Sequence, residues 1–151
     1  MKFLVTGSLH NKKGPKIIIT FASLYILIFL IIKTAAGFSV WSSVENARIF
    51  YENTGEGSIL DEIHAEIFYF ALIFLFTGSV IRELFSARYR IVSLYFLFAS
   101  GLLYLLLFFL SFYIYELIPF AMITFYAAFM YHIVLQIWIL IKLLNSSNKC
   151  D

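Results

Sequence analysis

Residues 91–115 read IVSLYFLFASGLLYLLLFFLSFYIY, a stretch without any Asp, Glu, Lys or Arg. Residues 117–141, LIPFAMITFYAAFMYHIVLQIWILI, are equally free of these four residue types. About 20 apolar residues are enough to cross the hydrocarbon core of a membrane as an α-helix. Strands are excluded, because lipid offers no hydrogen-bond partner to an open sheet edge. The two stretches therefore predict two transmembrane helices.

Two further apolar runs precede these stretches. Residues 17–32 carry no charge, and this run extends to residue 38 if Lys33 reaches the membrane interface with its charged end. Residues 63–81 form the other run, which His64 and Glu66 interrupt near its start. The chain is therefore expected to be an all-α integral membrane protein in which residues 1–151 form one domain. Its four-transmembrane-helix bundle is expected to have spans at about residues 16–37, 59–85, 90–115 and 118–144.

The composition excludes the other broad classes of protein. Of the 151 residues, 62% are hydrophobic and only 13% are charged, whereas soluble domains carry about 25% charged residues. So little polar surface cannot coat a water-soluble domain, and it is untypical of a disordered chain. The net charge of +2 is too small to indicate a nucleic-acid partner. The single cysteine, Cys150, excludes an internal disulfide bond and a multi-cysteine metal site.

Prolines and capping patterns mark the expected helix starts. Pro15 and Pro119 lie where two apolar runs begin, and there the missing N–H of proline costs nothing. The capping box Ser-Ser-Val-Glu at residues 42–45 predicts a short helix of about ten residues, ending near residues 53–55. A second box, Ser-Ile-Leu-Asp at residues 58–61, places the start of the second span near Ile59. We interpret the first run as a retained helix, because it is long for a cleaved signal peptide.

The charged residues are divided unequally between the two ends of the predicted bundle. With the N-terminus in the cytoplasm, the inner side carries Lys2, Lys12, Lys13, Lys16, Arg82, Arg88, Arg90, Lys142 and Lys149 against Glu83 and Asp151. The outer side then carries Lys33 and Arg48 against Glu45, Glu52, Glu56, Asp61, Glu62 and Glu116. The positive-inside rule predicts from this division that both termini are cytoplasmic. The expected location is the cell (inner or plasma) membrane.

In this orientation, residues 37–58 form the one sizeable outer loop. Its large apolar and small side chains fall at helical spacing, at Phe38, Trp41, Val44, Ala47 and Tyr51. An amphipathic helix with Trp and Tyr beside a span is typical of a segment that lies along the membrane surface. Two roles stay open for this segment: a packed cap on the bundle, or a docking surface or lid over a site.

The densest group of titratable side chains lies at the start of the second span, and it consists of Asp61, Glu62, His64 and Glu66. Acidic residues are favourable in the first turn of a helix, which explains Asp61 and Glu62. Glu66 lies about 10 Å into the helix, where an ionisable group needs a partner. Carboxylates and imidazole also suit a cation or proton site. The expected counter-charges for Glu66 are His64, Lys33 and Arg48.

Small and polar residues recur along the third and fourth spans. On the fourth span they are Thr124, Ala128, His132 and Gln136; on the third they are Ser93, Ser100, Tyr104 and Ser111. Such stripes face other helices, because small residues permit close approach and polar groups find partners there. We expect His132 to be neutral and hydrogen-bonded to a hydroxyl such as that of Tyr104. A role for His132 in binding haem or a metal, or in relaying protons, stays open.

A haem b held between two imidazoles of this chain is not expected. His64 lies about 8 Å below the outer end of its helix, and His132 about 20 Å below the outer end of its own. The difference of about 12 Å does not suit ligation of a single iron. The sequence also lacks a His-Glu-x-x-His helix and a Gly-rich phosphate loop. No metal and no cofactor is therefore predicted firmly.

Three functional hypotheses remain. The scarcity of catalytic polar groups and the short loops favour a non-enzymatic integral membrane subunit that packs against other chains, or against copies of itself, in an accessory, scaffold or assembly role. The second hypothesis is a small oligomeric proton- or cation-coupled transporter or channel that uses Glu66. The third is a redox subunit in which His132 or His64 binds haem b, or which binds quinone. The aromatic residues, 20% of the chain, are expected to pack between helices and contact lipid.

Overall fold

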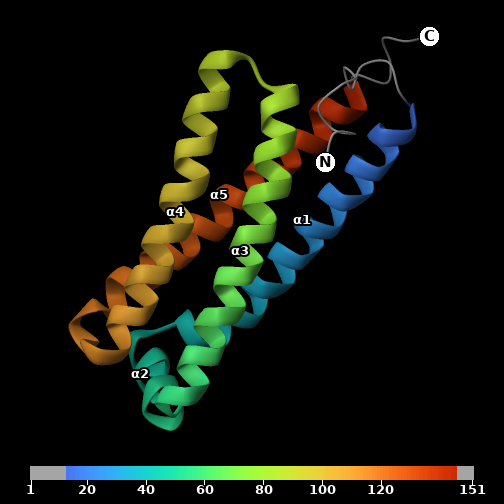
Figure 1. Ribbon diagram of the computed structural model, residues 1–151. Helices are drawn as coiled ribbons and strands as arrows, with labels where there is room; N and C mark the ends of the chain where they lie inside the picture. Colours follow the sequence, from blue (N-terminus) through green and yellow to red (C-terminus); the bar gives the residue numbers. More distant parts are fainter. Residues whose placement is uncertain (1–12, 146–151) are drawn as a thin grey trace.

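The computed structural model describes residues 13–145, which form five α-helices and one short 3-10 helix, without a strand in that range (Figure 1). The elements are α1 (Lys13–Trp41), α2 (Val44–Asn53), α3 (Glu56–Leu84), α4 (Ala87–Tyr113), η3 (Tyr115–Leu117) and α5 (Ile118–Asn145). Of these, α1, α3, α4 and α5 are long and apolar enough to cross a membrane. For the described residues, the predictions of an all-helical fold and of four helices able to cross a membrane are confirmed.

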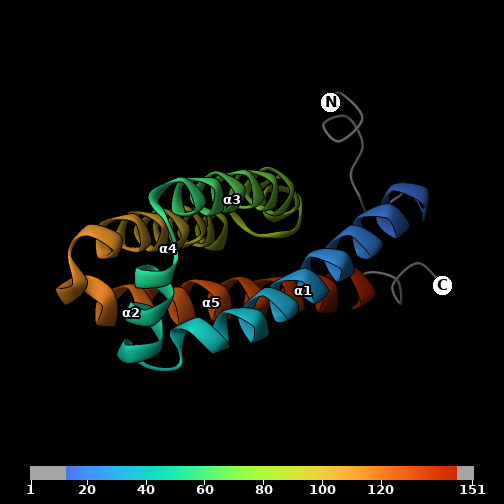
Figure 2. The same ribbon diagram turned by 90° about the horizontal axis from the view of Figure 1, so that it is seen from below.

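The four long helices form two layers, with α3 beside α4 in one layer and α1 beside α5 in the other (Figure 2). The most extensive contacts between helices join α5 to α4 and α5 to α1, and α3 packs mainly on α4. The contact of α3 with α5 is smaller, and that of α1 with α3 is slight. As a result α5 is the most deeply covered of the four spans and α1 the least.

Two helices extend beyond the limits expected for their spans. Helix α1 continues past residue 37 to Trp41, so Lys33 lies well inside it. Helix α3 starts before Ile59, at Glu56, with Gly55 in the cap position. Ser58 lies inside the first turn and caps nothing, because the helix has already begun before the predicted capping box.

Helix α2 occupies the segment where the sequence predicts a short helix. Ser43 is its N-cap, and the Ser43 side chain accepts a hydrogen bond from the Asn46 backbone N–H. The buried side chains of α2 are Ala47 and Tyr51. The Tyr51 hydroxyl lies 2.7 Å from Ser111 Oγ on α4. Helix α2 thus packs as a cap on one end of the bundle.

Aromatic rings fill the core beneath this cap. Trp41 contacts the rings of Tyr51, Phe108 and Phe125, with centroids 6.1, 5.8 and 5.9 Å away. Tyr104 stacks on Phe108 at 5.9 Å. A second cluster at the opposite end is mainly aliphatic, and its buried members are Ile19, Val80, Ile81, Phe85, Leu97, Leu135, Ile139 and Leu143. The buried aromatic rings are therefore concentrated in the half of the core that lies nearer α2.

Basic side chains bind the turn between α3 and α4 at the opposite end from α2. Arg90 Nη2 donates to the Phe85 carbonyl at 3.1 Å, and Lys142 Nζ donates to the Leu84 carbonyl at 3.2 Å. The Lys142 ammonium also lies 4.3 Å from the centre of the Phe85 ring. These contacts satisfy carbonyls that the end of α3 leaves without a helical partner.

Candidate functional site

A three-residue charged cluster links α1 to α3. Lys33 Nζ on α1 lies 2.7 Å from Glu66 Oε1 and 3.1 Å from Glu62 Oε1, both on α3. The spacing of four residues puts the two carboxylates on one face of α3, where a single ammonium group can reach both. Glu66 is buried, with 3% of its surface exposed, whereas 46% of the Glu62 side chain is exposed. Of the three expected counter-charges, Lys33 is the one that meets Glu66.

The cluster borders the charge-free part of α3. Residues 67–81 of α3 contain no charged side chain, and these 15 residues span about 22 Å of helix. Since the hydrocarbon core of a bilayer is about 30 Å thick, it extends past this run. The charged residues Arg82 and Glu83 follow the run at one end. The rest of the hydrocarbon core is therefore expected at the other end, toward Glu66. An ion pair at this depth is costly unless both charges are partnered, which is what Lys33 and Glu66 provide.

A cavity of about 170 Å³ adjoins the cluster and is lined by residues of α1, α2, α3, α4 and α5. Its charged and aromatic lining includes Lys33, Glu66, Trp41, Tyr104, Phe108 and Phe125. Tyr104 is buried, with 2% of its surface exposed, yet its hydroxyl takes part in none of the hydrogen bonds found within residues 13–145. The aromatic cavity is therefore lined by the ion-paired Glu66 carboxylate and by a tyrosine hydroxyl without a hydrogen-bond partner within residues 13–145.

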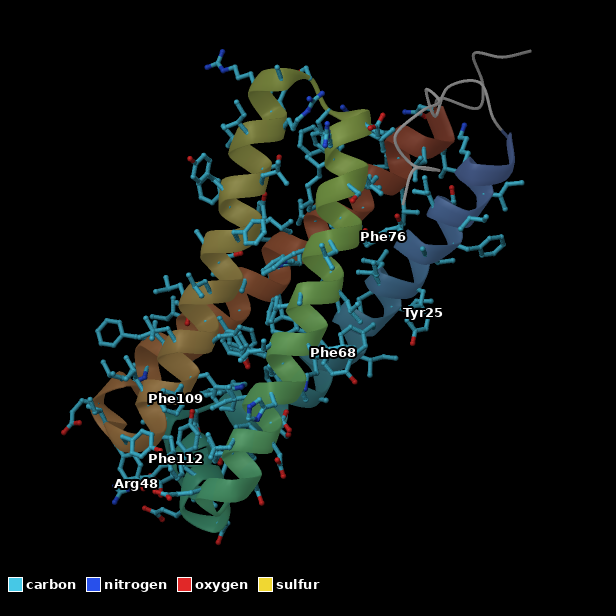
Figure 3. The ribbon with its side chains drawn as sticks, in the orientation of Figure 1. Tyr25, Arg48, Phe68, Phe76, Phe109 and Phe112 are labelled. Atoms are coloured by element: carbon cyan, nitrogen blue, oxygen red, sulfur yellow. The ribbon has the colours of Figure 1, made fainter. Side chains whose placement is uncertain are left out.

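The other members of the predicted acidic cluster lie apart from this site. Asp61 and His64 are exposed on other faces of α3. Arg48 pairs with Glu52 on its own helix, with Nε 2.8 Å from Oε1, and this hydrogen bond raises the pKa of Arg48. Figure 3 places Arg48 at the outer edge of the α2 end. Across the described part of the chain, no three His, Cys, Asp or Glu side chains are grouped to hold a metal ion.

The stripe on α5 is largely internal. Ala128, His132 and Gln136 are buried, and Thr124 is half-buried with its hydroxyl bonded to the Phe120 and Ala121 carbonyls. Gln136 Nε2 donates to Thr77 Oγ1 on α3 at 2.6 Å. This hydrogen bond links two spans, and the sequence pattern indicated Gln136 without indicating Thr77.

The expected hydrogen bond between His132 and Tyr104 is wrong. His132 Nδ1 lies 2.6 Å from the Ala128 carbonyl of its own helix, and Nε2 has no partner among the described residues. The Phe70 ring packs against both side chains, with its centroid 5.5 Å from that of His132 and 6.0 Å from that of Tyr104. Phe70 follows His64 by six residues, or about 9 Å along α3. The two histidines are therefore at different depths, and one iron does not fit between them.

The stripe on α4 divides between two faces. Ser93, Tyr104 and Ser111 are buried, whereas the Ser100 hydroxyl bonds to the Phe96 carbonyl of its own helix. Ser111 is the partner of Tyr51 on α2. The Ser93 carbonyl accepts a hydrogen bond from the Tyr131 hydroxyl on α5 at 3.1 Å. The sequence reasoning missed the polar roles of Tyr51 and Thr77, because a hydroxyl on an apolar face reveals its partner only when the helices are packed.

Comparison with protein-family models, with curated proteins and with solved structures finds no match for this chain. Its function is therefore argued from the arrangement of its own residues. Within residues 13–145, that arrangement contains inter-helix polar contacts and a charged, aromatic-lined cavity. Ion-pair formation, hydrogen bonding and the binding of a small polar molecule are within the chemistry of these groups.

Proposed function

We propose that the chain is a non-enzymatic integral membrane subunit that packs through α1 against a second chain in a larger membrane complex. The single observation that carries this proposal is the position of Tyr25. This residue lies near the middle of the apolar part of α1, is 73% exposed, and points away from the bundle (Figure 3). Its hydroxyl has no hydrogen-bond partner among residues 13–145.

A tyrosine hydroxyl is favourable at the membrane interface, where water and headgroups accept its proton. At mid-depth, lipid tails offer no acceptor, and an unpaired hydroxyl costs free energy. Polar side chains on spanning helices are accordingly found where helices meet. Phe21, one turn earlier on α1, is 69% exposed and extends the same surface. These two residues support a protein partner for α1 in preference to lipid alone.

The remaining polar groups at membrane depth support a structural role. The Lys33–Glu66 pair joins α1 to α3, and the Thr77–Gln136 hydrogen bond joins α3 to α5. Both contacts join helices inside the bundle. A subunit of this kind acts by holding its neighbours and needs no catalytic set.

The test is site-specific photo-crosslinking in native membranes. A benzophenone amino acid at position 25 is expected to give an adduct with one defined protein, either another subunit or a second copy of this chain. The same probe at Leu102, which is exposed on α4, is the matched control and is expected to label lipid. If position 25 also labels only lipid, the subunit proposal is rejected. If position 25 instead gives a protein adduct, Tyr25→Phe is expected to weaken the complex on blue-native electrophoresis.

We place the protein in the cell membrane, with both termini in the cytoplasm and α2 on the outer side. Arg82, Arg88 and Arg90 at the α3–α4 turn, with acidic residues such as Glu56 at the α2 end, support it under the positive-inside rule. Cys150 lies outside the described residues. In intact cells, an impermeant maleimide should label Glu56→Cys in a Cys150→Ser background and leave native Cys150 unlabelled. Labelling of Cys150 from outside would reverse the orientation.

A second candidate is a small proton- or cation-coupled transporter, and the cavity beside Glu66 favours it. A transporter of this kind needs a carboxylate at membrane depth that changes its charge or its partner. Glu66→Gln keeps the shape of the side chain and removes the charge. If Glu66→Gln and Glu62→Gln both leave the physiological activity unchanged, no other carboxylate at this depth of α3 remains to couple ion movement, and the transporter role is excluded.

A further inference from the structure

The cavity beside Glu66 has no use in the proposed subunit role, and its lining has a specific chemistry. We propose that it binds a small organic cation, namely an ammonium group that carries small apolar substituents. Three independent properties of the cavity point to this class of ligand: its charge, its walls and its volume.

The charge of the site is unbalanced. One ammonium group, that of Lys33, faces two carboxylates, and its ion pairs are with Oε1 of Glu62 at 3.1 Å and Oε1 of Glu66 at 2.7 Å. The hydroxyl of Tyr104, a buried residue, takes part in no hydrogen bond found among the described residues. Tyr104 and Glu66 line the same cavity. A net negative charge at membrane depth is unfavourable, and a monovalent cation in the cavity removes it.

The walls of the cavity are aromatic. Trp41, Tyr104, Phe108 and Phe125 line it together with the carboxylates. Aromatic rings attract organic ammonium groups through their negative faces, and Trp does so best. Ca²⁺ takes about six to eight oxygen ligands and Zn²⁺ about four N, S or O ligands, whereas the described residues contain no group of three His, Cys, Asp or Glu side chains that could hold a metal ion. The lining therefore favours an ammonium group over a metal ion.

The volume indicates how large a group the cavity can enclose. The cavity measures about 170 Å³, close to the roughly 150 Å³ in which an apolar cavity holds one benzene molecule. Drug-sized ligands occupy pockets of about 300 Å³ or more. A ligand of about six non-hydrogen atoms fits the available space. Small alkylammonium ions are of this size, and so is the ethanolamine headgroup of an aminophospholipid.

Tryptophan fluorescence provides the test, because the described chain contains two tryptophans and only Trp41 lines the cavity. In a Trp138→Phe background, the purified full-length protein is titrated with tetramethylammonium chloride or ethylammonium chloride, and with sodium chloride as the ionic-strength control. We expect a saturable change in Trp41 emission with at least one alkylammonium salt and none with sodium chloride. A response that does not saturate, or that sodium reproduces, overturns the proposal.

Variants assign the response to the site. Glu66→Gln is expected to weaken apparent binding at least about tenfold, because it removes a charge-assisted contact. Tyr104→Phe keeps the ring and is expected to weaken it roughly fivefold. Glu52→Gln, on α2 and outside the cavity lining, is the matched control and should bind as the parent does. Unchanged binding in folded Glu66→Gln counts against the proposal. If that variant does not fold, unchanged binding in Tyr104→Phe has the same meaning.

Lipid extraction from the purified protein distinguishes the two sources of the ligand. A stoichiometric aminophospholipid that is bound by the parent and reduced in Glu66→Gln or Tyr104→Phe assigns the cavity to a headgroup. Saturable alkylammonium binding without such a lipid assigns it to a free amine. If neither is found, the cavity is not a cation site. These outcomes do not depend on the crosslinking at position 25, so the two proposals succeed or fail separately.

Discussion

The Lys33 ammonium group on α1 lies 2.7 Å from the Glu66 carboxylate on α3, and this ion pair joins two helices that otherwise share little contact. Helix α1 is held to the bundle mainly by α5. The ion pair therefore supplies a second point of attachment, near the α2 end. It also allows each residue to lie at a membrane depth that neither would favour alone.

We expect Lys33→Met to destabilise the bundle by about 3 kcal/mol, because it leaves the buried Glu66 carboxylate without its partner. The double variant Lys33→Met/Glu66→Gln should lose less than the single variant, since no unpaired charge remains. The measurement is equilibrium unfolding of the detergent-solubilised protein in a double-mutant cycle. Additive losses in the two single variants would show that the pair contributes no coupling.

The four spans could be predicted from the sequence, because length and the absence of charge decide which helices cross a bilayer. The partner of Glu66 could not be predicted. His64, Lys33 and Arg48 were equally open on the sequence, and the choice depends on which face of α1 meets α3. That face is set by the packing of α1 on α5. Arg48 instead pairs within its own helix, where Glu52 is four residues away.

Thr77→Val is expected to be more destabilising than Gln136→Leu. Thr77→Val leaves the buried Gln136 amide with neither hydrogen-bond partner, since Gln136 Oε1 is already unpaired among the described residues. An unsatisfied buried polar group costs about 1–3 kcal/mol. After Gln136→Leu, the Thr77 hydroxyl can bond to a carbonyl of its own helix. The free energy of unfolding should recover in Thr77→Val/Gln136→Leu, and a double variant less stable than Thr77→Val would contradict this account.

For the polar residues of α5, the sequence predicts which residues share a face but not which residues they contact. The spacing of four along α5 identifies residues of one face, and Ala128, His132 and Gln136 are indeed buried together. Spacing does not specify the partner across the interface. For Gln136 the partner is Thr77, a residue that the α3 pattern does not distinguish from its apolar neighbours. For His132, Phe70 occupies the position where a hydroxyl was expected.

Tyr51→Phe is expected to lower the free energy of unfolding by about 1 kcal/mol, because the hydrogen bond to Ser111 is lost while Ser111 keeps its bond to the Phe108 carbonyl. Burial raises the pKa of the Tyr51 phenol, and the Ser111 hydrogen bond opposes that shift only in part. The folded protein therefore keeps this proton when the unfolded chain, with a tyrosine pKa of about 10, releases it.

The upward shift of the Tyr51 pKa determines how the stability depends on pH. The stabilising contribution of Tyr51 is fully present below about pH 10 and is lost as the pH rises above that value toward the folded-state pKa. The difference in unfolding free energy between the parent and Tyr51→Phe should be constant from about pH 8 to pH 10 and then decrease. Comparing the two proteins removes the contribution of the other tyrosines. A difference that stays constant to about pH 11 would mean that Tyr51 titrates normally.

Gly37→Ala is expected to destabilise the bundle, whereas Gly57→Ala is not. A Cβ at Gly37 would collide with the Phe125 ring, because α1 and α5 approach closely there. Overpacking of this kind costs about 1–3 kcal/mol. A Cβ at Gly57, in the first turn of α3, meets nothing within 4 Å, and alanine is favoured over glycine in a helix by up to about 1 kcal/mol.

Thermal unfolding of Gly37→Ala and Gly57→Ala, compared with the parent, separates the steric effect at position 37 from a general effect of replacing glycine. Gly37→Ala/Phe125→Leu should recover stability, because the smaller side chain frees the space that the added methyl group needs. Gly37 and Phe125 also both line the cavity beside Glu66. Gly37→Ala alone should therefore force the ring or the helix to move and reduce alkylammonium binding at the Trp41 reporter. If Gly37→Ala is as stable as the parent, α1 and α5 are not in the close contact described here.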